Sequence, residues 1–211
     1  MSLGQIIRRI LGPLTDPVAR FYRSYYVDLD SLGRTLGHLP EVGTILEIGC
    51  GDGHLCEALA REFGSASVLG IDIAEGPGGL YGGRSKGVEF RQVPAEEDLI
   101  SEFPEGFDLV VLSDVLHHVP LDERGDLLET AWALTSSGGH LAVKDWVSTR
   151  NMATALAYLS DRFITGDRPL FFESRSAFLD LVTTHTPKGR VTGEGSVPPH
   201  HNNLYVIVAN I

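Results

Sequence analysis

The feature that most constrains this chain is a short apolar run that leads into three closely spaced glycines. Residues 44–48 read Thr-Ile-Leu-Glu-Ile, and Gly49, Gly51 and Gly53 follow at every second position. A short apolar run of this kind is typical of a buried strand, and glycines allow a sharp turn that leaves no side chain between the peptide planes and a ligand. Residues 54–63 then place apolar side chains at helical spacing. The segment predicts a strand, a ligand-binding loop and a helix.

Two carboxylates favour a cofactor loop over a purely structural turn, in which glycine is also common. Glu47 lies within an otherwise apolar strand, where an unpaired charge would be costly, so we expect it to face hydrogen-bond donors or a cationic ligand. Asp72 ends the next strand-like run, residues 67–72, where a carboxylate can accept both hydroxyls of a ribose.

The glycine spacing distinguishes this loop from the dinucleotide fingerprint Gly-x-Gly-x-x-Gly. Glu47 followed by Gly49-x-Gly51-x-Gly53 resembles the first motif of the class I S-adenosylmethionine-dependent methyltransferases, and the similarity covers about residues 40–147. The resemblance implies S-adenosylmethionine as cofactor, with its methionine part at Glu47 and the glycine loop and its ribose at Asp72. The cofactor-binding residues that it predicts are Glu47, Gly49, Cys50, Gly51, Asp72, Ile73, Ala95, Glu96 and Ser113.

Strand-like and helix-like segments alternate after residue 40, which predicts an α/β fold. We expect a doubly wound, mostly parallel, seven-stranded Rossmann-like sheet that ends in an antiparallel strand, with a small helical cap. Asp30 or Ser31 is expected to cap a helix that runs through Leu39. Within a single domain, the predicted parts are an N-terminal helical cap (1–40), a cofactor-binding core (41–147), a helical insertion over the acceptor site (148–187) and final strands (188–211).

Charge and composition limit the classes of partner. The chain has 211 residues and a formal net charge of -11, which opposes a nucleic-acid backbone as the main partner. Cys50 and Cys56 are its only cysteines and are expected to be reduced, as in a cytoplasmic protein. No apolar run is long enough to span a bilayer. Residues 6–14 are expected to form a helix packed on the domain edge, with a peripheral membrane contact or a dimer contact as alternatives. The oligomeric state stays open.

Methyl transfer requires alignment of donor and acceptor, and a base only where the acceptor loses a proton. The candidates for that base are His118, Asp145, His200 and His201. Each has a structural alternative: Asp114 can pair with His118 on one helical face and leave His117 exposed, Lys144 and nearby backbone donors can satisfy Asp145, and loop histidines can be solvated. The predicted acceptor-binding residues are Tyr22, Tyr26, His117 and Trp146.

A metal-assisted reaction is the alternative for the two acids. Asp114 and Asp145 could supply oxygen ligands to Mg²⁺, as in some catechol-type methyltransferases. Trp146 stands where an asparagine would be wanted, however, so we predict no metal. The predicted function is S-adenosylmethionine-dependent methylation of a small-molecule or lipid-like metabolite. The alternatives are an NAD(P)-dependent oxidoreductase, which the glycine spacing opposes, and a non-catalytic, cofactor-binding regulatory protein.

Overall fold

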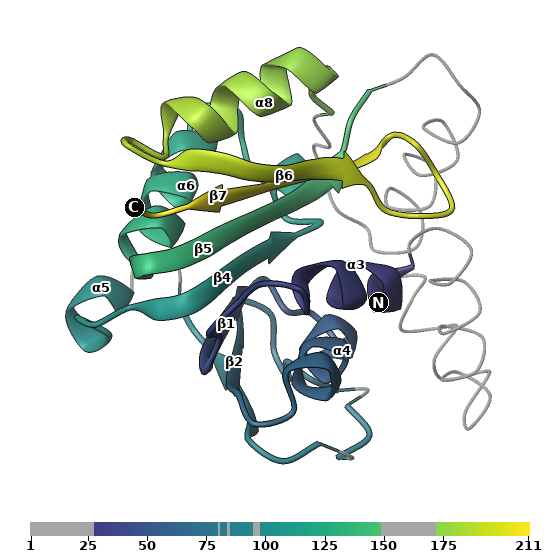
Figure 1. The fold of residues 1–211 in the computed structure, drawn as a ribbon, viewed down its shortest axis with the longest axis vertical. Coiled ribbons are helices and arrows are strands. Elements are labelled where there is room, and N and C mark those ends of the chain that lie inside the picture. The colour runs from purple at the N-terminus through teal and green to yellow at the C-terminus, as the bar shows by residue number, and fades with distance from the viewer. Residues whose placement is uncertain (1–27, 80, 84, 95–97, 149–171) are drawn as a thin grey trace.

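A seven-stranded sheet forms the centre of the molecule (Figure 1). The computed structural model describes residues 28–79, 81–83, 85–94, 98–148 and 172–211. The strand order is β3-β2-β1-β4-β5-β7-β6; β1 to β5 are parallel, and β7 is antiparallel to both of its neighbours. This arrangement confirms the predicted fold class. The strands are β1 Thr44–Ile48, β2 Ser67–Asp72, β3 Val88–Gln92, β4 Phe107–Ser113, β5 Thr135–Trp146, β6 Arg190–Ser196 and β7 Asn203–Ala209.

Helices cover both faces of the sheet, as the doubly wound arrangement requires. The helical segments within the described residues are α3 Leu29–Leu36, α4 His54–Phe63, α5 Leu99–Glu102, the 3₁₀ turn η2 Leu116–His118, α6 Arg124–Ala133 and α8 Arg175–Thr184. One apolar cluster joins α3 and α4 to the sheet, and a second joins α6 and α8 to its other face (Figure 1). Because both faces are covered, β4 is buried at every position except Asp108, and it is apolar apart from Asp108 and the terminal Ser113.

The order of the strands determines where a ligand can bind. The chain runs outward from β1 through β2 to β3 and then crosses back to β4, on the other side of β1. The carboxyl ends of β1 and β4 therefore lead into loops that diverge, and such a switch point is where open α/β sheets bind ligands. The glycine loop and the turn after β4 both begin there.

The first described helix begins earlier than expected. Asp28 is the N-cap of α3, and its carboxylate accepts a hydrogen bond from the Ser31 amide at 2.9 Å. The prediction of Asp30 or Ser31 as the cap was wrong, as was the extension to Leu39, because Gly37 ends the helix. A carboxylate before Leu29 can reach the first free amides of the helix, whereas Asp30 already lies inside its first turn.

Several predicted segments lie outside the described residues. These include most of the N-terminal helical cap, at 1–27, and most of the helical insertion, at 149–171. The predicted boundaries between the parts of the chain therefore stay predictions. Within the described residues, no helix combines the length and the apolar character needed to cross a membrane.

Candidate cofactor and acceptor site

The glycine loop after β1 contains two glycines that packing requires and one that faces open space. Gly49, Gly51 and Gly53 have φ values of +75°, +53° and +84°, in the left-handed region that favours glycine. A Cβ atom at Gly49 would lie 2.5 Å from Val115, and one at Gly53 would lie 2.6 Å from the Phe90 ring. A Cβ at Gly51 would meet no atom within 4 Å. Gly51 thus leaves room for a ligand beside its peptide.

Asp72 is tied directly to this loop. One oxygen of its carboxylate accepts the Gly51 amide hydrogen at 2.8 Å, and the other accepts that of Ala74 at 2.8 Å. The Cys50 amide donates to the Ile71 carbonyl at 3.0 Å, which holds the loop over the end of β2. The predicted ribose carboxylate and the predicted methionine loop therefore meet at the carboxyl edge of β1 and β2.

Glu47 is buried beneath the loop and faces α4. Its side chain is 3% exposed, and its carboxylate accepts a hydrogen bond from the Cys56 thiol at 2.8 Å. Burial raises the pKa of Glu47 to about 8; the Cys56 hydrogen bonds oppose this increase, and the charges of Asp72 and Asp114 add to it. Cys50 and Cys56 are both free and buried. A hydrogen bond with Cys50, burial and the nearby Glu47 charge raise the pKa of the Cys56 thiol.

At the end of β4, Ser113 and Asp114 form a strained and tightly held turn. Asp114 has a φ of +59°, and its amide donates to the Lys144 carbonyl at 2.9 Å. The Lys144 ammonium lies 2.5 Å from the Asp114 carboxylate, and the Ser113 hydroxyl donates to the same carboxylate at 3.4 Å. Lys144 therefore forms its ion pair with Asp114. Its charge also acts on Asp145, and the expected pairing of Asp114 with His118 stays a prediction.

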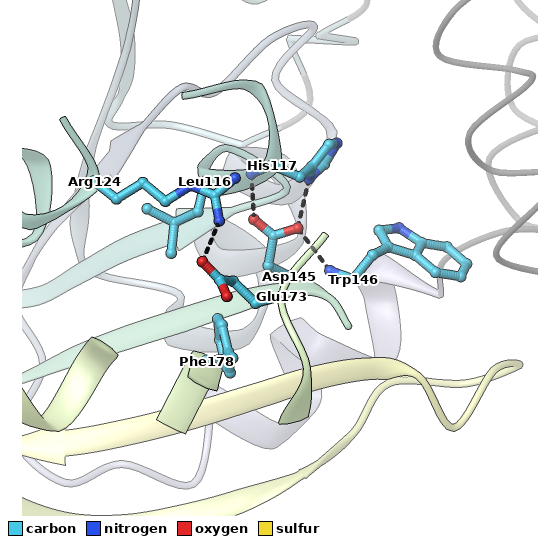
Figure 2. Close-up of a pocket in the computed structure, with 7 residues that line it drawn as sticks. All are labelled: Leu116, His117, Arg124, Asp145, Trp146, Glu173 and Phe178. Carbon is cyan, nitrogen blue, oxygen red and sulfur yellow. Dashed lines mark hydrogen bonds and ion pairs between the residues drawn. The ribbon is translucent and has the colours of Figure 1, made fainter. Parts of the chain in front are cut away.

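His117 and Asp145 form a buried pair at the ends of η2 and β5 (Figure 2). The Asp145 carboxylate contacts His117 Nδ1 at 2.5 Å and accepts the His117 amide at 3.0 Å and the Trp146 amide at 2.6 Å. Burial raises the pKa of Asp145, but His117, Lys144 and the Trp146 amide outweigh it and lower that pKa below its usual 3.8. His117 is only 3% exposed, so the expectation that it could be exposed was wrong.

Asp114, His117, Lys144 and Asp145 form one compact cluster at this edge of the sheet. The ligand atoms of Asp114, His117 and Asp145 all lie within 4.8 Å of one another. Such a set could hold a cation, but the Lys144 ammonium already lies against Asp114. The absence of a metal stays a prediction.

Arg124 and Glu173 line the same small cavity as His117 and Asp145, and sequence reasoning missed both. Arg124 is 1% exposed; its guanidinium donates to Glu173 at 3.0 Å and to the Val119 carbonyl at 3.0 Å. Burial lowers the pKa of Arg124, and the negative charges of Glu173 and Asp145 oppose this decrease. Nothing in the local pattern marks either residue, because they are far apart in sequence. Figure 2 shows the small cavity that they help to line, together with Leu116, His117, Asp145, Trp146 and Phe178.

Of the remaining predicted residues, some lie near His117 or Trp146, some are exposed, and some lie outside the described residues. His200 lies near Trp146, with ring centroids 5.7 Å apart, whereas His201 is an exposed loop residue and Ile73 is 73% exposed. The ring of His118 lies 4.0 Å from that of His117. Tyr22, Tyr26, Ala95 and Glu96 lie outside the described residues.

Comparison with protein families gives a match along most of the chain. The model of a family described as "Methyltransferase domain" matches residues 19–183. The ubiquinone biosynthesis O-methyltransferase of Acinetobacter baumannii (strain AYE) is 35% identical over 102 residues, which cover 46% of this chain and 41% of that protein. The protein of the same name from Pseudomonas syringae pv. tomato is 38% identical over 103 residues, with the same coverages. The chain thus matches less than half the length of these relatives.

Solved methyltransferase structures have the same fold. The 1,6-didemethyltoxoflavin-N1-methyltransferase of Burkholderia thailandensis aligns with a TM-score of 0.63 and 17% identity, over 97% of this chain and 86% of that one. An S-adenosylmethionine-dependent methyltransferase from Aquifex aeolicus aligns with a TM-score of 0.64 and 17% identity, over 99% and 98% of the two chains. At these identities, the likeness establishes the shared fold alone.

Proposed function

Because the chain belongs to the class I S-adenosylmethionine-dependent methyltransferases, we propose that it transfers the donor's methyl group to a small-molecule or lipid-like acceptor. The observation that carries the proposal is the hydrogen bond of 2.8 Å between Asp72 and the Gly51 amide, which joins the two predicted parts of the cofactor site. The bound donor supplies a methyl group activated by a positively charged sulfur.

The residues at the edge of β1 and β2 fit this cofactor. No atom lies within 4 Å of the position of a Cβ at Gly51, so a ligand can approach the loop there. Asp72 lies at the end of β2, where a carboxylate can accept ribose hydroxyls, and the exposed Ile73 can pack on a flat base. Buried Glu47 can provide a negative charge for the cationic donor. We assign these side chains and Ser113, at the end of β4, to cofactor binding.

For the acceptor, the proposal favours a hydroxyl oxygen. The relatives of 35–38% identity are named O-methyltransferases, and a hydroxyl must lose its proton on methylation. Asp145, with its lowered pKa, is ionised near neutral pH and contacts His117 Nδ1 at 2.5 Å. A carboxylate that accepts the Nδ1 hydrogen of an imidazole leaves the Nε2 as the atom that can take up a proton. We propose His117, supported by Asp145, as the proton acceptor. His118, His200 and His201 stay alternative candidates.

Asp72→Ala tests the cofactor site. We expect the affinity for S-adenosylmethionine to fall at least tenfold, because hydrogen bonds to a charged group contribute about 1.5–3 kcal/mol and a tenfold change corresponds to about 1.4 kcal/mol. Isothermal titration calorimetry measures this affinity. Asp122→Ala, which removes an exposed carboxylate beside α6, is the control and should leave the affinity unchanged. Equal affinities for the Asp72 variant and the wild type would place the ribose elsewhere.

The acceptor can be found by incubating cell extract with the protein and S-adenosylmethionine whose methyl group is isotopically labelled. Untargeted mass spectrometry should then detect a labelled small molecule with the methyl group on oxygen. A protein that binds the donor but labels no metabolite would instead be a non-catalytic binding protein.

A further inference from the structure

Glu47 is a buried carboxyl group without a cationic partner among the described residues. It lies near the end of β1, 3% exposed, and its hydrogen bond from the Cys56 thiol at 2.8 Å comes from a weak, neutral donor. Within the described ranges, no lysine, arginine or histidine forms an ion pair with it. An ionised carboxylate in such a place is costly, and the group reduces this cost by taking up a proton.

The charged groups around Glu47 also favour its neutral form. Asp72 faces it from β2, and Asp114 from the turn after β4, and both negative charges raise the pKa of Glu47, which burial brings to about 8. The Asp114 carboxylate is partly balanced by Lys144 of β5. On the helical side, α4 contributes the thiol and the backbone amide of Cys56, and the thiol lies next to that of Cys50. On the outer surface of α4, Arg61 and His54 both lie against Asp30 of α3, at 2.8 and 3.9 Å.

A cation that binds at the glycine loop would favour the ionised form of Glu47 over the neutral form. We propose that Glu47 is neutral in the cofactor-free protein and releases its proton when the positively charged methyl donor binds, so that the neutral-sulfur product allows the proton to return. The proposal rests on the proposed function, since it concerns the same cofactor site. The balance is simple: binding converts a carboxylic acid to a carboxylate and gives one proton to the solvent. The reverse follows when methyl transfer removes the positive charge of the sulfur.

The protein's relative affinity for the methyl donor and for its product should therefore depend on pH. Near pH 7 a carboxyl group with a pKa of about 8 is about nine-tenths protonated, whereas at pH 9 it is about nine-tenths ionised. The affinity for S-adenosylmethionine relative to S-adenosylhomocysteine should therefore rise about tenfold between pH 7 and pH 9. The two ligands share the same amino-acid group, so its own titration cancels in the ratio.

Calorimetric titrations in buffers of different ionisation enthalpy count the protons exchanged on binding. At pH 7 we expect S-adenosylmethionine to release about one more proton per molecule bound than S-adenosylhomocysteine. In Glu47→Gln, which keeps the size of the side chain but cannot titrate, this difference should disappear and the affinity ratio should not depend on pH. Infrared difference spectra of the cofactor-free wild type should show a protonated carboxylic acid that is missing from the variant.

Cys56→Ala provides a second variant. It removes the thiol donor that favours the ionised carboxylate, so proton release should persist to higher pH than in the wild type. Equal proton release for the two ligands in the wild type would overturn the proposed coupling and leave the proposed function intact. Failure of the wild type to bind S-adenosylmethionine at any pH would contradict the proposed function and the coupling together.

Discussion

Asp145 satisfies a buried negative charge with donors from two parts of the chain. Its carboxylate accepts the His117 and Trp146 amides and contacts His117 Nδ1. The preceding residue, Lys144, points to the opposite face of β5 and holds Asp114. Consecutive residues of one strand therefore hold the turn after β4, which positions the His117 ring.

His117→Phe should destabilise the protein by about 3 kcal/mol, because it leaves the buried Asp145 carboxylate without its contact to His117 Nδ1. Phenylalanine retains a ring that can pack on Phe172, whose centroid lies 5.4 Å from that of His117. The neighbouring variant His118→Phe is the control and should cost less than half as much, since the His118 side chain is only half-buried. Urea unfolding at pH 7 measures both. Equal losses would show that Asp145 does not depend on the imidazole.

The segment from β1 to α4 contains glycines that packing requires and one, Gly51, that lies beside open space. At Gly53 an added methyl group would meet Phe90 at 2.6 Å and the Gly78 backbone at 3.1 Å, while at Gly51 it would meet nothing within 4 Å. Both residues have positive φ, so the backbone penalty of a substitution is of the same kind at each position. The difference between them therefore isolates the role of the open space.

Gly53→Ala should cost about 3 kcal/mol or more in unfolding free energy, as the sum of overpacking and left-handed backbone strain. Gly51→Ala should cost about 1–2 kcal/mol, because only the backbone strain applies. Its main effect should be on cofactor binding, with at least a tenfold loss of affinity by calorimetry, as the methyl group enters the space assigned to the ligand. Unchanged affinity in Gly51→Ala would mean that the cofactor does not approach this peptide.

The stability of the whole molecule should depend on pH through two groups of opposite sign. Glu47 has a folded pKa of about 8, above its usual 4.5, so the folded protein holds a proton that the unfolded chain has lost, and stability falls as pH rises between these values. Asp145 has a lowered folded pKa, so its contribution is present above its usual 3.8 and is lost as pH falls below that value.

Glu47→Gln should therefore be more stable than the wild type in the absence of cofactor, by an amount that grows from pH 4.5 to pH 8. The 2.5 pH units from 4.5 to 7 correspond to about 3 kcal/mol at pH 7. Urea unfolding of both proteins at pH 5, 7 and 8 gives this difference. A difference that stays constant over this range would show that Glu47 does not titrate between its unfolded and folded pKa values.

Much of this architecture was predictable because it depends on local patterns. The predicted strands at 44–48 and 67–72 and the predicted helix at 54–63 match β1, β2 and α4 residue for residue. Periodicity and glycine positions determine such elements. The alternation of strands and helices then predicts the parallel sheet, and the glycine loop indicates the family.

The partners of the site residues were decided by the tertiary structure alone. Strand alternation indicates that residues 144 and 145 point to opposite faces, yet it does not identify which acid Lys144 meets or that His117 meets Asp145. The contact between Arg124 and Glu173 spans 49 residues. Such contacts depend on the order and register of the strands, which bring distant side chains together, and on the exclusion of water, which makes each buried charge require a partner.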